Sequence, residues 1–162
     1  MAARNGMDIF ELQGLNAEMT DYNLIGMLYV FQYLMGNTDW EVSGPHNIEL
    51  MADEAQIPYA IPFDFDWAGV IATPYAKPDP DLGIRNVRER LYRGYCRAPE
   101  ELAPVFQLFN EKKEDLYDLY RNQEGLDEKY LEKTLEYFDD FYETINDQRK
   151  VEREFIRKCR QT

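Results

Sequence analysis

Residues 36–50 read GNTDWEVSGPHNIEL, and this stretch directly follows the most apolar part of the chain. That part, residues 22–35 (YNLIGMLYVFQYLM), is apolar on nearly every face. In a water-soluble protein such a segment predicts a buried central helix. Thr20-Asp21 before it is typical of an N-cap, and Gly36-Asn37 after it is typical of a helix end. A polar loop is then expected over 38–47.

A β-hairpin is predicted after this loop. Residues 48–50 (IEL) alternate apolar and polar side chains, as a half-buried strand does, and residues 53–56 (DEAQ) have the composition of a turn. The returning strand is expected over 59–61 (YAI). Pro58 and Pro62 on either side of it lack the N–H that a central strand needs, so they confine it to a sheet edge.

The rest of the chain is predicted to be an extended loop followed by helices. Residues 70–84 contain three prolines and Gly83, which favour the loop. Apolar residues at three- and four-residue spacing then predict helices over 85–95, 102–119, 127–145 and 151–159. The expected fold class is therefore α+β and mainly helical. It has a buried central helix, a short hairpin and a C-terminal helical bundle, in a single domain over 1–162.

Charge and composition exclude several classes of protein. The chain has 18 Lys and Arg against 31 Asp and Glu, a formal net charge of -13, which argues against a general binder of nucleic acid or anionic membranes. Hydrophobic residues make up 44%, which excludes a disordered chain, yet no segment has the apolar length of a membrane span. The first residues hold no apolar signal region. Cys96 and Cys159 could pair or both be free, and the sequence does not decide between these states.

Oxygen-bearing side chains stand at three places around the predicted hairpin. Asp39 follows the buried helix, Asn47 directly precedes the first strand, and Asp64 and Asp66 follow the second strand. Because a hairpin returns the chain to its start, we expect these groups to converge. Carboxylate and amide oxygens together with phosphate suit Mg²⁺. Acid, amide, hairpin and acid is also the order of parts in a kinase C-lobe, where the first Asp orients the acceptor hydroxyl and the other two groups hold the metal.

Each of these residues also has a purely structural interpretation. Asp39 could form a turn at the helix end, and the single histidine, His46, could brace the loop by hydrogen bonding. Asp64 and Asp66 could pair with an arginine from the basic segment that follows. That segment contains Arg85, Arg88, Arg90, Arg93 and Arg97. Its arginines, Arg88 and Arg93 among them, either bind phosphate or an acidic substrate, or pair with nearby carboxylates.

The runs GNTDW, HN and IPFDFD resemble the CotH family of spore-coat-type protein kinases, and an uncharacterised CotH-like group of Bacteroidetes-type bacteria in particular. RERLYRGYCR at 88–97 and VEREFIRKCR at 151–160 also resemble that group, so the resemblance spans nearly the whole chain. Two departures separate the chain from the protein-kinase pattern. The gap from Asp39 to Asn47 is longer, and Asp66 stands where that pattern has Gly.

The resemblance implies a kinase C-lobe in which Asp39 is the catalytic-loop acid and Asn47 and Asp64, with Asp66 as an additional ligand, bind Mg²⁺ or Mn²⁺. Asp64 is favoured over Asp66 because it directly follows the strand. The implied activity is phosphoryl transfer from ATP or another nucleotide to a protein hydroxyl. No N-lobe precedes residue 20, so the chain is expected to be a fragment that is inactive alone. Relatives suggest an exported, periplasmic or cell-surface protein; otherwise it would be cytoplasmic.

Two other functions remain open at this point. A non-catalytic helical interaction module would keep the lobe and lack the chemistry. Metal-dependent hydrolysis would use the same oxygen ligands without a nucleotide.

Overall fold

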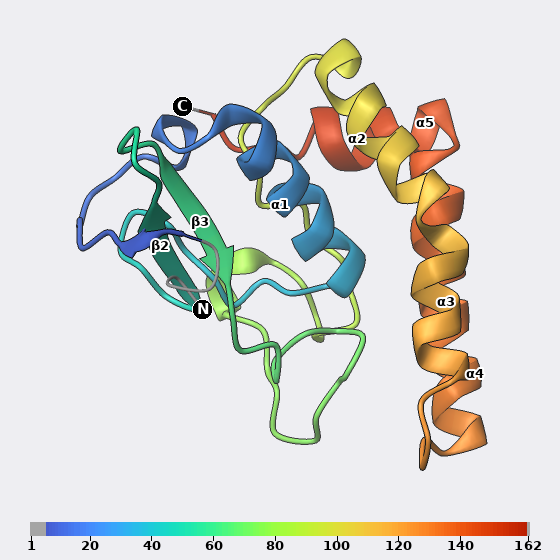
Figure 1. The fold of residues 1–162 in the computed structure, drawn as a ribbon. Helices are drawn as coiled ribbons and strands as arrows, with labels where there is room; N and C mark the ends of the chain where they lie inside the picture. Colours follow the sequence, from blue (N-terminus) through green and yellow to red (C-terminus); the bar gives the residue numbers. More distant parts are fainter. Residues whose placement is uncertain (1–5, 162) are drawn as a thin grey trace. The chain divides into compact units, whose positions relative to one another are not determined.

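The computed structural model describes residues 6–161. They divide into two compact units that meet in the sequence between Leu91 and Tyr92, called here the N-terminal and the C-terminal unit. The N-terminal unit combines a small antiparallel sheet with one long helix, and the C-terminal unit is helical (Figure 1). The predicted α+β class is thereby confirmed. Every described helix falls short of the length and apolarity that crossing a bilayer requires.

The predicted central helix is α1 (Tyr22–Met35), and it is buried along most of its length. Asp21 caps its N-terminus by accepting hydrogen bonds from two backbone N–H groups of the first turn. At its other end Gly36 takes the left-handed conformation (φ 63°). The N–H of Asn37 then donates to the carbonyl of Gln32 at 2.9 Å, and the N–H of Gly36 to that of Tyr33 at 3.1 Å. These two bonds form a Schellman motif, in which glycine suits the left-handed position.

The predicted hairpin consists of β2 (Ile48–Ala52) and β3 (Pro58–Pro62), paired antiparallel with Ile48 opposite Pro62. A two-residue strand that was not predicted, β1 (Asp8–Ile9), pairs with the other side of β2. The sheet order is β1-β2-β3, so β3 lies at an edge, as its prolines predicted. The N–H of Asp21 donates to the carbonyl of Pro58 at 2.9 Å, which ties the start of α1 to β3.

The helix predicted over 85–95 is wrong. A short 3-10 turn (Pro80–Leu82) is followed by irregular chain up to residue 98. The guanidinium of Arg90 donates instead to the carbonyls of Tyr33 and Leu34, at 3.0 and 3.3 Å, in the last turn of α1. The last carbonyls of a helix have no N–H four residues further along to bond, and a cation at a helix C-terminus is favoured by the helix dipole. A long-range contact with α1 therefore replaces local helical bonding.

The C-terminal unit contains the helices α2 (Pro99–Glu111), α3 (Lys113–Arg121), α4 (Glu128–Ile145) and α5 (Gln148–Val151), followed by a π-helical turn (Glu152–Ile156). The single helix predicted over 102–119 is therefore two helices, and Lys112 forms the break between them (φ −93°, ψ 3°). The helix predicted over 151–159 starts earlier and ends before Cys159. Phe155 lies in the core, where its ring is 4.9 Å from Tyr92 and 5.0 Å from Phe106.

A disulfide joins Cys96 to Cys159, which resolves the alternative that the sequence left open. Backbone hydrogen bonds join the two segments beside the disulfide. The N–H of Cys96 donates to the carbonyl of Arg160 at 3.0 Å, and the N–H of Arg160 donates to the carbonyl of Gly94 at 2.9 Å. The two cysteines are 63 positions apart in the sequence. The disulfide therefore closes a loop that includes all the helices of this unit.

Candidate functional site

Asp39, His46 and Asn47 lie together in the loop after α1. One carboxylate oxygen of Asp39, Oδ1, is 2.9 Å from His46 Nε2, and the other, Oδ2, accepts a hydrogen bond from Asn47 Nδ2 at 2.9 Å. Asn47 Nδ2 also donates to the backbone carbonyl of Asp39 at 2.8 Å. The structure thus joins the predicted catalytic acid directly to one of the predicted metal ligands.

The loop itself brings these residues together. Glu41 and His46 exchange two backbone hydrogen bonds of 3.0 Å, which fold residues 41–46 into a tight turn. On either side of Asp39 the chain is anchored, because the side chain of Asn37 accepts the N–H of Asp39 at 3.0 Å and Trp40 is 2% exposed. The Asp39 side chain is 31% exposed between these anchors, so a molecule in solution can reach it.

Asn47 and Asp64 both have backbone conformations that residues other than glycine rarely adopt. Their φ angles are 52° and 53°, in the left-handed region, which Asn and Asp tolerate better than most residues. The N–H of Phe63 donates to the carbonyl of Asn47 at 3.0 Å. Asp64 therefore directly follows a residue that is bonded to Asn47. Such conformations are frequent at functional sites.

The carboxylates of Asp64 and Asp66 make local contacts instead of joining Asp39. Asp64 Oδ1 accepts the N–H of Asp66 at 3.4 Å, and Asp66 Oδ2 accepts the hydroxyl of Tyr75 at 3.1 Å. Within residues 6–161 neither carboxylate has an arginine partner, so the expected pairing with the basic segment is not found there. In that same range no three His, Cys, Asp or Glu side chains are grouped so that they could hold a metal ion.

Three arginines of the basic segment contact other groups of the N-terminal unit. Arg85 donates to Glu89 through Nε at 2.9 Å and Nη2 at 2.7 Å, which is the ion-pairing alternative for this arginine. Arg88 is exposed, and its Nη1 lies 3.5 Å from the carbonyl of Gly69. Arg93 is half-buried and belongs to the C-terminal unit. These contacts give Arg85 and Arg90 structural roles.

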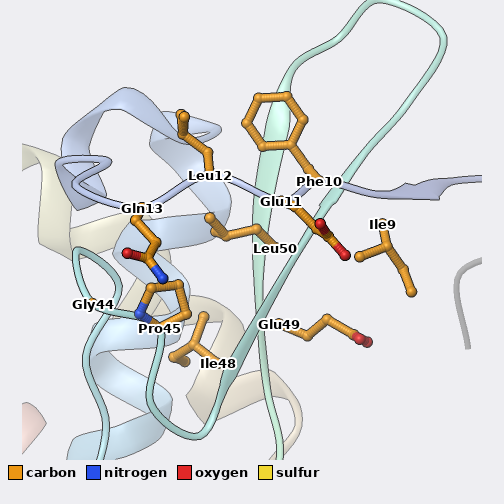
Figure 2. Close-up of a pocket in the computed structure, with 10 residues that line it drawn as sticks. All are labelled: Ile9, Phe10, Glu11, Leu12, Gln13, Gly44, Pro45, Ile48, Glu49 and Leu50. Atoms are coloured by element: carbon orange, nitrogen blue, oxygen red, sulfur yellow. The ribbon is translucent and has the colours of Figure 1, made fainter.

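An open hollow of about 600 Å³ lies beside the site, and the sequence did not predict it. Figure 2 shows its lining, which comes from residues 9–13, from Gly44 and Pro45, and from residues 48–50. The last two of these groups flank His46 and Asn47 in the chain. The alternation of 48–50 did indicate that Glu49 points away from the core, but nothing in the sequence showed that residues 9–13 would lie opposite it.

Comparisons of the chain with protein-family models, with curated proteins and with solved structures gave no match. The resemblance to CotH-type kinases therefore stays a prediction.

Proposed function

We propose that the N-terminal unit carries the acceptor and metal side of a phosphoryl-transfer site of the CotH-like kinase type. Its substrates would be ATP or another nucleotide and a protein hydroxyl, and its cofactor Mg²⁺ or Mn²⁺. The observation that supports this most is the contact of both Asp39 oxygens with His46 and Asn47. In this proposal the unit corresponds to a kinase C-lobe and depends on an N-lobe to complete the nucleotide site.

Asp39 would orient the acceptor hydroxyl. Each carboxylate oxygen has two lone pairs, so an oxygen that already accepts one hydrogen bond can accept another. His46 and Asn47 fix both oxygens of Asp39 and leave the side chain 31% exposed. A carboxylate held in one orientation and open to solvent can accept the proton of an incoming hydroxyl group.

Asn47 and Asp64 would hold the metal ion. Asn47 uses its Nδ2 for Asp39, which leaves its Oδ1 without a hydrogen bond from residues 6–161. Asp64 is exposed and accepts only the long bond from Asp66 among those residues. These oxygens are of the type that Mg²⁺ prefers, so the residues present fit such an ion. A cation bound there would neutralise the charge of the phosphate, which the acidic chain alone would repel.

The hollow beside Asn47 would receive the nucleoside part of the nucleotide. Apolar residues such as Ile9 and Phe10 suit the faces of a base, and the carboxylates of Glu11 and Glu49 can accept hydrogen bonds from sugar hydroxyls (Figure 2). The hollow and the Asp39 loop share the residues 44–50.

The test is replacement of the two acids in the full-length protein, in which an N-lobe completes the site. Asp39→Asn and Asp64→Asn should each reduce ATP-dependent labelling of a protein acceptor by about 100-fold or more, because each removes a charge from the reaction site. Asp81→Asn, an exposed aspartate of the same unit, is the matched control and should leave labelling unchanged. Unchanged labelling in both acid variants would refute the catalytic role.

Binding measurements separate this proposal from the other two. Calorimetry should show that Mg²⁺ and the nucleotide bind together, and that Asp64→Asn weakens binding. Binding of Mg²⁺ alone, with no effect of nucleotide, would favour metal-dependent hydrolysis. Absence of both would favour the interaction module, which the local bonding of Asp64 and Asp66 also favours.

A further inference from the structure

Two amide side chains are fully buried at the end of α1. Gln32 and Asn37 are each 1% exposed. Three of their atoms have no hydrogen-bond partner among the protein groups of residues 6–161. They are Nε2 and Oε1 of Gln32 and Nδ2 of Asn37. Buried polar groups without partners are costly, so this arrangement requires an explanation.

A backbone hydrogen bond joins these two residues. Gln32 and Asn37 are the two positions that the Schellman motif joins, through the bond of 2.9 Å from the N–H of Asn37 to the carbonyl of Gln32. Side chains at these two positions commonly contact each other, usually as an apolar pair. Here both members are amides, and both are enclosed by the N-terminal unit.

We infer that Gln32 and Asn37 bind one ordered internal water that joins their amides. The Nδ2 of Asn37 can donate to the water, and the water can donate to the Oε1 of Gln32, which gives each of these two atoms a partner. Internal waters typically make two to four hydrogen bonds to buried polar groups of this kind.

The water would fix the position of Asp39. The other amide atom of Asn37, its Oδ1, accepts the N–H of Asp39 at 3.0 Å. A water that holds the Asn37 amide in one orientation therefore also holds the backbone from which Asp39 reaches His46 and Asn47. Gln32 is then a positioning residue, which acts on the Asp39 carboxylate through the water and Asn37. Only its importance for catalysis rests on the function proposed above; the water and its effect on the loop do not.

The experiment follows the water and the Asp39 amide by NMR on the full chain. In the wild-type protein, long-lived water should give cross-relaxation to the side-chain amide protons of Gln32 and Asn37. Gln32→Met keeps the length of the side chain and removes its polar atoms. This variant should speed hydrogen exchange of the Asp39 amide by about 10-fold, the equivalent of about 1.4 kcal/mol. The Leu24 amide, which Asp21 caps at the other end of α1, should exchange unchanged.

The outcomes are distinct from those of the activity test, because none of these measurements needs a nucleotide. A direct amide–amide bond without water signals would overturn the inference, as would unchanged Asp39 exchange in Gln32→Met. If that variant does not fold, the wild-type water signals still decide. In an active chain, Gln32→Met should lower kcat and leave the nucleotide KM unchanged, whereas a general loss of packing would change both.

Discussion

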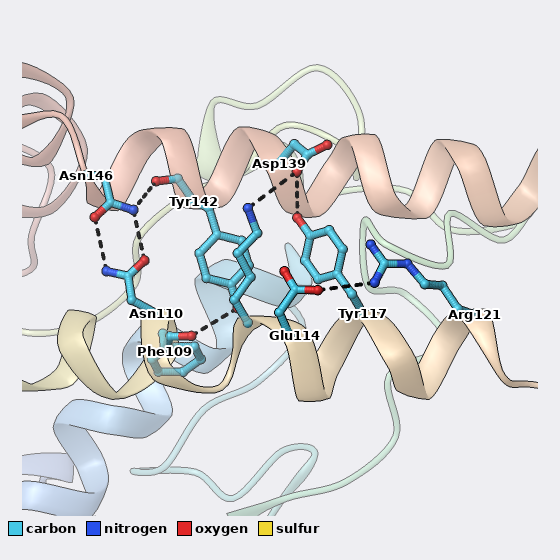
Figure 3. Close-up of polar contacts among 9 residues, drawn as sticks. Phe109, Asn110, Glu114, Tyr117, Arg121, Asp139, Tyr142 and Asn146 are labelled. Carbon is cyan, nitrogen blue, oxygen red and sulfur yellow. Dashed lines mark hydrogen bonds and ion pairs between the residues drawn. The ribbon is translucent and has the colours of Figure 1, made fainter.

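The two units of the chain are stabilised by different kinds of interaction. The C-terminal unit has a disulfide, aromatic pairs in tilted and edge-to-face geometry, and bonds between helices, of which Figure 3 shows Tyr117 donating to Asp139 and Asn110 paired with Asn146. The N-terminal unit contains the left-handed Asn47 and Asp64 and the two buried amides of Gln32 and Asn37. Strained and incompletely bonded groups cost stability, and strained backbone is concentrated at functional sites. The left-handed residues of the N-terminal unit therefore support the proposal that the chemistry lies there.

Removal of the disulfide should have the largest effect and should be confined to one unit. A loop of 63 positions corresponds to a loss of about 4 kcal/mol in the free energy of unfolding, from the entropy that the unfolded chain regains. Urea unfolding of Cys96→Ser/Cys159→Ser, followed by NMR signals from each unit, measures this loss. An equal loss of unfolding free energy in both units would show that the disulfide does not stabilise the C-terminal unit alone.

Two tyrosines should make the C-terminal unit sensitive to alkali. Burial, together with the bond to Asp139, raises the pKa of Tyr117 far above 10, and burial raises the pKa of Tyr142 to about 12. The unfolded chain therefore loses these protons at a lower pH than the folded chain. The contribution of these two tyrosines to the free energy of unfolding is fully present below pH 10 and is lost as pH rises through their folded pKa values. Unfolding from pH 9 to 12 measures the decline, which should be smaller in Tyr142→Phe.

Removal of the Tyr117 hydroxyl sharpens the same comparison at neutral pH. Tyr117→Phe loses the bond of 2.7 Å to Asp139, and because this carboxylate is exposed the cost should be about 1 kcal/mol. The exchange rate of the Asp39 amide, in the other unit, should not change. A change there would contradict independent stabilisation of the two units.

The smallest effect is expected from relief of backbone strain in the N-terminal unit. Ala72 has φ 50°, so Ala72→Gly should raise the free energy of unfolding by up to about 1 kcal/mol. Asn47→Gly relieves a similar conformation but removes both bonds to Asp39, so it should not stabilise the protein. Thermal unfolding of the two variants separates strain that serves a site from strain that does not.

The sequence predicted the parts of the fold that depend on local pattern. The apolar run 22–35 and the alternation around Leu50 specified the buried helix and the hairpin, because burial and periodicity act along the chain. The helix over 85–95 failed because Arg90 bonds to distant carbonyls of α1. The two-residue strand β1 carries too few residues to show a pattern.

The candidate site was predictable only in part, for the same reason. Asp39 follows the buried helix and Asn47 directly precedes the first hairpin strand, so the two were expected to converge. They do make contact. The contact of Asp66 with Tyr75 depends on how the loop between them folds, and the lack of a partner for the buried Gln32 amide depends on how the core packs around it. No spacing in the sequence indicates either of them.

The disulfide between Cys96 and Cys159 also determines how the chain carries mechanical load. The two cysteines are the attachment points of a covalent ring that contains every helix of the C-terminal unit. When the chain is pulled from both sides of this ring, tension passes through the sulfur atoms and bypasses residues 97–158. The helices inside the ring bear none of that force.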